Sequence, residues 1–409
     1  MISTFTDQTT PDLIDSPRAW LRLGIATLFG TIGGVGMWSV VVALPAIQAE
    51  FGVDRASAAL PYTLAMLGFA AGGVLTGRLA DHFGIAIPLA AGTIAMGLGY
   101  IAVGHAGSIW QVALLHGGMI GLGCSATFGP LMADISHWFA RRRGIAVSIV
   151  AASNYIAGTF WPTVIQHFIA TDGWRATHIG IGIVLMISML PLTLALRAKA
   201  PLHHAAAAAH RQAAMPFSAN TLQVILCIAG ICCCVAMSMP QVHLVAYCGD
   251  LGYGVARGAE MLSLMLGCGI VSRLISGLIA DRIGGVRTLL LGSLLQGSAL
   301  FLYLWFNGLT SLYVISALFG LFQGGIVPSY AIIVREYFPP QQAGTRVGLV
   351  LMATLVGMAL GGWMSGAIFD LTGSYRAAFL NGLGWNLLNL TIVTFLLVRS
   401  RVRPTLRAA

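Results

Sequence analysis

A single cation, Arg273, lies in the middle of a long apolar stretch and has no acidic residue beside it. The positions one helical turn away are Gly269 and Gly277, so no carboxylate of the same helix can pair with it. Asp281 marks the expected end of this helix, and a rise of about 1.5 Å per residue places Arg273 about 12 Å from that end. If the stretch crosses a membrane, a charge at this depth costs at least about 2.5 kcal/mol and normally faces a cavity or a partner.

The guanidinium of Arg273 presents a planar fork that matches a carboxylate with two parallel hydrogen bonds. We therefore expect Arg273 to bind an anionic ligand. The alternative is that its side chain extends toward the membrane surface or bonds to backbone carbonyls of a neighbouring helix. The segment 348–366 contains no Lys or Arg, so a site with one cation favours monocarboxylates over dicarboxylates.

Other polar and aromatic residues fall within apolar stretches and could complete such a site. For each of them, hydrogen bonding between helices or simple packing is the alternative. Histidine can exchange a proton near neutral pH, so His116 and His243 are candidates for proton coupling. The expected substrate-binding residues besides Arg273 are Asn154, His116, Trp38, Tyr330, Trp161 and Gln323.

The composition that surrounds these residues is that of a membrane protein. Hydrophobic residues make up 57% of the 409 residues and charged residues only 9%, where soluble domains have about 25%. Stretches of about 20 apolar residues can cross a bilayer as helices. We expect an all-α membrane protein with twelve spans, near 19–46, 56–79, 86–105, 109–136, 143–168, 177–197, 219–247, 258–280, 286–305, 311–335, 345–369 and 377–398.

The chain repeats itself at half its length. Gly77-Arg-Leu-Ala-Asp-His-Phe-Gly84 returns as Gly277-Leu-Ile-Ala-Asp-Arg-Ile-Gly284, and two further short motifs recur in the same register. A parallel repeat of this kind indicates two six-helix halves related by an axis along the membrane normal. The predicted organisation is an N-terminal half, a cytoplasmic linker and a C-terminal half, at 1–197, 198–218 and 219–409.

The positive charges predict how the chain lies in the membrane. If both termini are cytoplasmic, the inner loops hold most of the Lys and Arg, and the outer loops hold only Arg55, Arg175, Arg257 and Arg376. The net charge of +9 is then scattered over inner loops, which does not indicate nucleic-acid binding. The cysteines follow no ligand spacing, so we expect no metal site and no cofactor.

Other function classes require residues that the spans do not offer. Aspartyl proteolysis needs two facing acids, and nucleophilic hydrolysis needs a nucleophile paired with a base, so we expect no enzyme. An exporter of cationic drugs needs an acid within the membrane, and the central spans offer only Asp134.

The Gly-x-Leu-Ala-Asp-x-x-Gly loop, its repeat and the twelve spans resemble the major facilitator superfamily. The resemblance covers nearly the whole chain. It implies that Asp81 and Asp281 latch the cytoplasmic side when the opposite side is open. A carboxylate in this place can oppose the positive N-terminus of a helix in the other half.

Within this superfamily the chain is similar to the oxalate/formate antiporter and monocarboxylate porter branch. The similar segments are Glu50-Phe-Gly-Val-Asp-Arg-Ala56, Trp138 to Ala146 and His243 to Gly252. The branch carries a substrate-binding arginine where Arg273 stands. The chain departs from it in having Gly269 where animal-type porters have an Asp, and in having no lysine in helix one or eleven.

These observations together favour a monomeric transporter of small monocarboxylates that works by alternating access. We expect it in the cell inner (plasma) membrane, coupled to protons. A carboxylate anion exchanger of the oxalate/formate type is the alternative, and a drug exporter is a further one.

Overall fold

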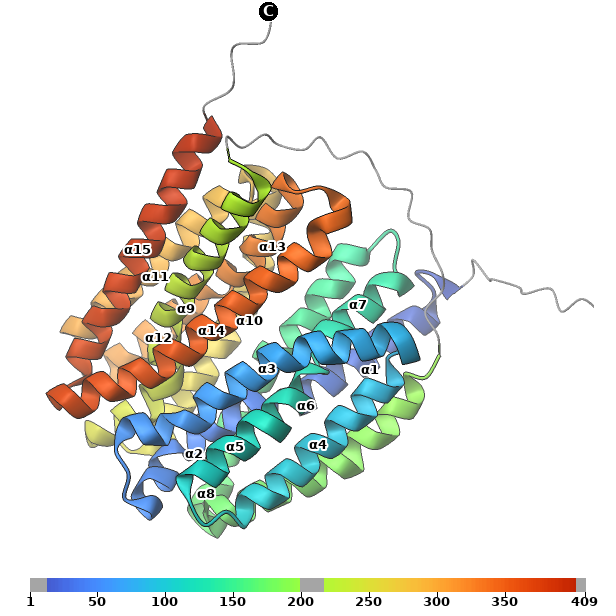
Figure 1. Ribbon diagram of the computed structural model, residues 1–409. Coiled ribbons are helices and arrows are strands. Elements are labelled where there is room, and N and C mark those ends of the chain that lie inside the picture. Colours follow the sequence, from blue (N-terminus) through green and yellow to red (C-terminus); the bar gives the residue numbers. More distant parts are fainter. Residues whose placement is uncertain (1–12, 199–216, 402–409) are drawn as a thin grey trace, which may run out of the picture.

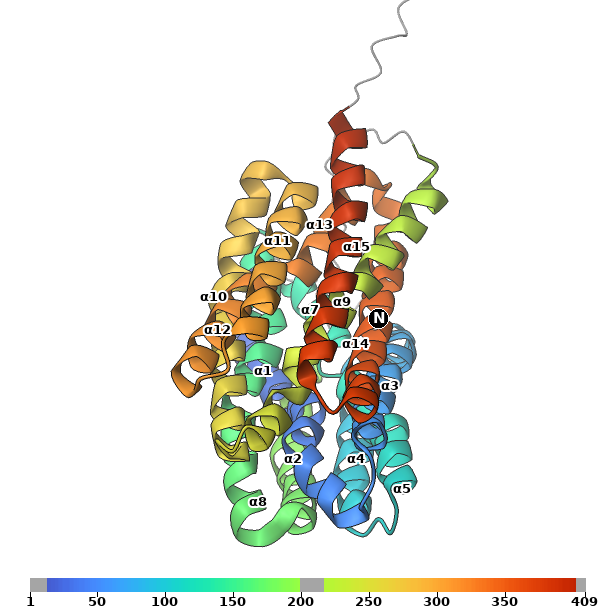
Figure 2. The same cartoon turned by 90° about the vertical axis from the view of Figure 1, so that its left-hand side faces the viewer.

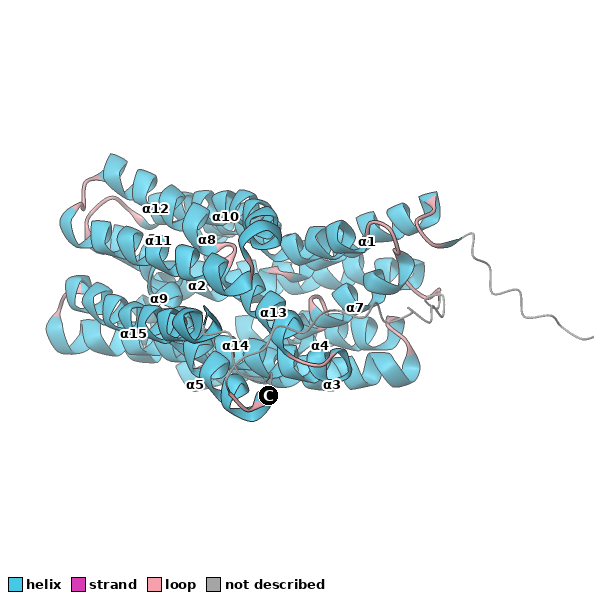
Figure 3. Ribbon diagram, turned by 90° about the horizontal axis from the view of Figure 1, so that it is seen from above, coloured by secondary structure: helices cyan, strands magenta, loops and turns pink. Residues whose placement is uncertain are grey.

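The structure is a computed structural model that describes residues 13–198 and 217–401, and every regular element in these ranges is a helix (Figure 3). The predicted all-helical membrane fold is thereby confirmed. The N-terminal helices are α1 Pro17–Gly33, α2 Val35–Phe51, α3 Arg55–Phe83, α4 Ala86–Gly104, α5 Ile109–Leu115, the π-helix η2 His116–Gly121, α6 Leu122–Ser125, α7 Gly129–Trp138 and α8 Arg143–Ala195. The remaining helices are α9 Ala219–Asp250, α10 Val255–Ile283, α11 Gly285–Trp305, α12 Leu309–Gln323, α13 Ile326–Tyr337, α14 Pro340–Thr372 and α15 Tyr375–Arg401.

Several of these helices join into single crossings, and one of them turns back. Eleven helical segments of the described residues are long and apolar enough to span a membrane. The longest, Gly144–Ala195, contains Gly173 at φ 81° and ψ 161°, a conformation that only glycine adopts readily, so its helix reverses there and crosses twice. The twelve predicted spans therefore agree with the structure, and most helices extend a few residues beyond the predicted bounds.

The sequence repeat is also a repeat of backbone geometry. Helices α3 and α10 have 29 residues each and begin at Arg55 and Val255. They are capped by Gly84 (φ 80°, ψ 166°) and Gly284 (φ 84°, ψ 162°), two glycines with nearly the same left-handed conformation. Equal lengths and equal turns show that the repeated loop performs the same structural task twice.

We call α1–α8 the N-terminal half and α9–α15 the C-terminal half; the predicted linker lies almost wholly outside the described residues. Figure 1 shows the yellow-to-red half beside the blue-to-green half, and Figure 2 shows the same two bundles from the side. Helix α14 packs along α3, and α10 packs along α8, so both pairs join the halves.

The two ends of the bundle are named here by a residue at each. The Arg55 end contains the start of α3, and the Asp81 end contains its finish. The helix directions place the four arginines predicted for the outer loops together at the Arg55 end, at the starts of α3, the second part of α8, α10 and α15.

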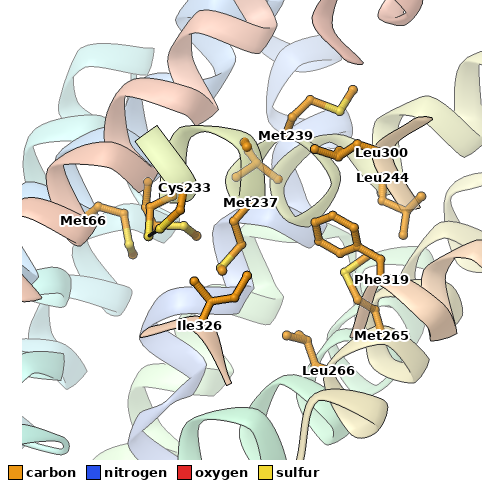
Figure 4. Close-up of a cluster of buried hydrophobic side chains, with 14 of the residues drawn as sticks. Met66, Cys233, Met237, Met239, Leu244, Met265, Leu266, Leu300, Phe319 and Ile326 are labelled. Carbon is orange, nitrogen blue, oxygen red and sulfur yellow. Dashed lines mark hydrogen bonds between the residues drawn. The ribbon is translucent and has the colours of Figure 1, made fainter. Parts of the chain in front are cut away.

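Close packing inside the halves depends on small residues. In the N-terminal half, the backbone of Gly68 in α3 lies against Gly117 in η2, where a Cβ would collide with the Gly117 carbonyl. A core of Met, Leu, Phe and Cys side chains fills the C-terminal half and continues across the boundary to Met66 of α3, and part of it is drawn in Figure 4. These contacts pack the helices within the halves and also join the N-terminal half to the C-terminal half.

Candidate functional site

Arg273 lies on α10 at the boundary between the two halves. Its Nη1 donates to the carbonyl oxygen of Ala151 in α8 at 2.7 Å, and its Nε donates to that of Gly324, in its own C-terminal half, at a longer 3.4 Å. Among the described residues, no carboxylate forms an ion pair with it. Its partners are thus backbone carbonyls of neighbouring helices, which was the alternative left open by the sequence.

The ring of Tyr155 covers the guanidinium of Arg273, with 4.3 Å from the Arg273 Cζ to the ring centroid. The ring also fills the space beside Gly269. A Cβ added at Gly269 would lie against Cε1 of Tyr155, too close for any real side chain. Tyr155 therefore stands where a side chain at position 269 would otherwise approach the arginine. The sequence did not single out Tyr155 as a partner, because nothing local shows which residue of α8 faces Arg273.

Trp38 and Asn154 are brought together in the N-terminal half. The Trp38 indole N–H lies 3.2 Å from Oδ1 of Asn154 and 3.3 Å from its backbone oxygen. Beside them, Gly158 of α8 lies between Trp38 and Leu266 of α10. Asn154 directly precedes Tyr155 in α8, and Trp38 lies close to the boundary with α10 through Gly158. The space beside Asn154 has a volume of about 10 Å³, room for one water molecule.

Trp161 and Gln323 form hydrogen bonds to residues other than Arg273. The indole N–H of Trp161 donates to Thr31 at 3.0 Å and so ties α8 to α1. Gln323 precedes Gly324, and its side-chain oxygen accepts from Gln241 at 2.9 Å. Its Nε2 is buried without a partner, so Gln323 has a free donor close in sequence to a carbonyl that Arg273 binds.

Tyr330 and His116 lie inside their own halves. The hydroxyl of the fully buried Tyr330 bonds to Asn389 of α15 at 3.3 Å. The ring of His116 lies 5.9 Å from that of His178, and its Nδ1 is 2.8 Å from the Val112 carbonyl. The structure does not bring these two residues to Arg273, because helix rotation turns each toward its own bundle.

His243 belongs to a group of residues that joins the halves at the Arg55 end. Arg55 of α3 forms an ion pair with Asp250 at the end of α9, at 3.2 Å. It also donates to the Tyr375 hydroxyl at 2.7 Å, and Tyr375 contacts His243. Asp370 at the end of α14 accepts the backbone N–H groups of Arg55 and Ala56 at 2.8 and 2.7 Å. We call Arg55, Asp250, Asp370, Tyr375 and His243 the closure cluster.

The Asp81 end shows no comparable closure. Asp81 and Asp281 are exposed, and neither forms an ion pair within the part of the chain that the structure describes. A Cβ added at Gly77 or Gly277 would meet nothing within 4 Å. The structure is therefore closed at the Arg55 end and unlatched at the Asp81 end, and the predicted role of Asp81 and Asp281 concerns the opposite conformation.

Asp134, the acid that a cation exporter would need, is already paired. Arg22 donates to its two carboxylate oxygens from Nε at 2.8 Å and from Nη2 at 3.0 Å, and both side chains are more than 90% buried. Nη2 also donates to the Leu196 carbonyl at 2.9 Å. This bidentate pair ties α1, α7 and α8 together and leaves Asp134 no free charge to attract a cation.

Two repeated helical halves that meet at Arg273 and at the closure cluster form the architecture of a membrane transporter. Similarity to known proteins shows the family. Residues 26–310 and 226–408 match the family model described as the Major Facilitator Superfamily. The chain belongs to the Major Facilitator Superfamily.

Known proteins resemble the chain in sequence and in fold. It is 29% identical to Monocarboxylate transporter 13 of Rattus norvegicus over 70% of this chain and 68% of that protein. It is 23% identical to the MFS-type transporter pynF of Aspergillus niger over 93% and 88% of the two chains, and 23% identical to the Agnestins efflux protein AgnL12 of Paecilomyces divaricatus over 81% and 75%. Among solved structures, a mutant of the nucleoside transporter NupG has a TM-score of 0.71 at 14% identity, with 92% of this chain and 99% of that one covered.

Proposed function

We propose that this protein is a secondary transporter of small monocarboxylates, with Arg273 as the residue that binds the carboxylate. The observation that carries the proposal is that the Arg273 guanidinium bonds to carbonyls of both halves, at Ala151 and Gly324, and to no carboxylate of the described residues. A backbone carbonyl is a weaker partner for a guanidinium than a carboxylate. A substrate anion can therefore replace these bonds. The similarity to Monocarboxylate transporter 13 supports this substrate class.

In the mechanism, the substrate changes which contacts cross the boundary. In the present conformation, the bond from Arg273 to Ala151 helps to hold α10 against α8. A carboxylate that takes the guanidinium releases this bond and neutralises the charge, so the halves can rock about the site. Trp38, Asn154 and Tyr155 would then form the wall on the N-terminal side. Asp81 and Asp281 would latch their end in the opposite conformation.

The orientation and the coupling belong to the same proposal. The arginine distribution favours the Asp81 end and both termini on the cytoplasmic side of the plasma membrane. We propose transport by a monomer with a proton as the coupled ion, carried at His243 rather than at His116, because His243 contacts Tyr375, which Arg55 of the other half also contacts. Carboxylate exchange is the second candidate. One of the similar proteins is an efflux protein. This concerns the direction of transport and does not alter the role proposed for Arg273.

The test is uptake by purified protein in liposomes. The panel consists of labelled formate, lactate, pyruvate, benzoate and oxalate, with and without an inward proton gradient, and Arg273→Gln serves as the paired variant. Uptake of a monocarboxylate that the variant loses supports the proposal. Stimulation by the gradient indicates symport, and stimulation by unlabelled acid inside the liposomes indicates exchange. Normal uptake by the variant would refute the site.

A further inference from the structure

A directional chain of hydrogen bonds crosses the closure cluster from one half to the other. It begins at Arg55 of α3, whose Nη1 lies 2.7 Å from the Tyr375 hydroxyl. That hydroxyl lies 3.2 Å from Nδ1 of His243. The other ring nitrogen of His243, Nε2, lies 2.8 Å from the carbonyl oxygen of Gly362 in α14. All three bonds are buried at the Arg55 end.

The direction of each bond follows from the groups involved. A carbonyl oxygen only accepts, so Nε2 of His243 must carry a hydrogen. A guanidinium only donates, so the Tyr375 oxygen accepts from Arg55 and its own hydrogen is left to donate to Nδ1 of His243. Nδ1 can accept only if it carries no proton. The chain is therefore complete only with the neutral imidazole, and with the tautomer that is protonated at Nε2.

The charges that face His243 give it no anionic partner among the described residues. On α9, Asp250 is engaged with Arg55, and on α14, Asp370 is engaged with the backbone N–H groups that begin α3. The ring of Tyr247 on α9 packs against Tyr375 at 5.3 Å. The nearest cation is Arg55 itself, on the other side of the Tyr375 hydroxyl. A second positive charge at His243 would thus add repulsion and find no carboxylate to balance it.

We propose that His243 senses protons at the closure cluster: the neutral ring holds the Arg55 end closed, and the protonated ring favours its opening. The proton comes from water when this end opens and adds to the Nδ1 lone pair. Nδ1 then becomes a donor, so the Tyr375 oxygen faces two cationic donors and its hydrogen loses its acceptor. The bond that ties Arg55 to the C-terminal half is thereby weakened.

The inference deepens the alternating-access part of the proposed function and does not depend on the substrate. Acid on the Arg55 side would increase the share of molecules open to that side. His243 thus acts as a positioning residue through Tyr375 and Arg55, without contacting the transported carboxylate.

The test measures the opening of the Arg55 end directly. Spin labels are placed at Gly107 and Asn307, two exposed positions in loops of different halves at this end. The background carries alanine at Cys227 and Cys268, the two native cysteines that are not fully buried. Distances between the labels are then measured in lipid nanodiscs between about pH 8 and about pH 5, the range in which histidine changes its charge.

For the wild-type residues, the ratio of long to short distances should rise about tenfold on acidification for each unit of pKa difference between the open and closed conformations. His243→Gln keeps a donor for Gly362 and an acceptor for Tyr375 without a charge, so it should stay closed at every pH. Tyr375→Phe should raise the open population at every pH and remove its pH response. His178→Gln, a change at a buried histidine within the N-terminal half, is the control and should respond as the wild type does.

Three outcomes would overturn the inference: distances in the wild type that do not change with pH, a response that His243→Gln retains, or one that Tyr375→Phe retains. The measurement uses no substrate. A failure here leaves the carboxylate site at Arg273 standing, and a failure of the uptake test leaves the pH-sensitive closure standing.

Discussion

The guanidinium of Arg273 is bonded to the backbone oxygen of Ala151, at 2.7 Å and across the boundary between the two halves. The residue that would bind a substrate anion is thus also a residue that holds the halves together. Binding of an anion at Arg273 would therefore be coupled to the contact between α10 and α8, which must change when the halves move.

Changing Arg273 should separate its charge from its geometry. Arg273→Gln removes the charge and should lower carboxylate affinity about 10- to 100-fold, the range for a lost charged hydrogen bond. Arg273→Lys keeps the charge but not the planar fork, so it should retain part of the affinity. The measurement is the concentration dependence of uptake in liposomes. Equal affinities in all three proteins would count against the site.

Tyr155 should be incompatible with a side chain at position 269. Gly269→Asp would drive its Cβ into the Tyr155 ring, so this change alone should lower the thermal stability and the uptake. Adding Tyr155→Ala makes room, and the new carboxylate can then pair with Arg273 one turn away. We expect the double variant to regain stability and to bind carboxylates more weakly than the wild type.

Gly267 provides the matched control on the same helix. A Cβ there would lie 3.4 Å from Thr159, an ordinary contact. Gly267→Ala should therefore leave both stability and uptake close to the wild type. A Gly269→Asp single variant that is as stable as Gly267→Ala would show that Tyr155 does not fill this space in the membrane.

Asp54 and Asp370 both cap the N-terminus of α3, but from different halves. Asp54 accepts the Ser57 N–H at 2.7 Å, whereas Asp370 accepts those of Arg55 and Ala56. Asp370→Ala should shift the free-energy difference between the closed and open conformations by about 1–2 kcal/mol toward opening of the Arg55 end. This is a factor of roughly 5 to 30 in the ratio of open to closed molecules. Asp54→Ala should lower the free energy of unfolding by about 1 kcal/mol and leave the ratio of open to closed molecules unchanged. Spin-label distances and thermal unfolding separate the two effects.

The Asp54 cap should also respond to acid. Hydrogen bonds from the Ser57 side chain and backbone hold the pKa of Asp54 below its usual value. Its stabilising effect is then complete above the unfolded value of about 3.9 and is lost as the pH falls through the lower folded value. The stability difference between wild type and Asp54→Ala should therefore shrink only in strongly acidic buffer. A difference that persists there would indicate another role.

The buried pair of Arg22 and Asp134 should serve stability and not substrate choice. Arg22→Ala leaves a buried carboxylate without its partner and should destabilise the protein by about 3–5 kcal/mol. Replacing both residues, as Arg22→Met with Asp134→Leu, should recover most of this loss. Thermal unfolding measures the cost, and uptake of lipophilic cations tests the alternative. Cation transport by the wild type that the double variant loses would reopen the exporter hypothesis.

Several features could be predicted from single stretches of sequence. Arg273 was identified because its depth in a span and the glycines around it are properties of one helix. The recurrence of the Asp81 loop at Asp281 predicted two similar halves, and Gly84 and Gly284 adopt nearly the same conformation.

Other features depend on residues far apart in the chain. Arg273 and Ala151 are separated by 122 positions, and His243 and Tyr375 by 132, so no local pattern relates them. Tyr155, Asp250, Asp370 and Tyr375 were missed for this reason. His116 and Tyr330 were expected beside Arg273 because they are polar and central, but depth does not determine which way a helix face points.

The sequence by itself determined that the chain crosses the membrane as helices, because lipid forces each apolar segment to satisfy its own backbone hydrogen bonds. It also determined where a cation stands within one of these segments. Only the tertiary structure decided which carbonyls and rings that cation meets, and which end of the bundle is closed. These depend on the rotation of each helix about its axis, and packing against neighbouring helices, not local composition, sets that rotation.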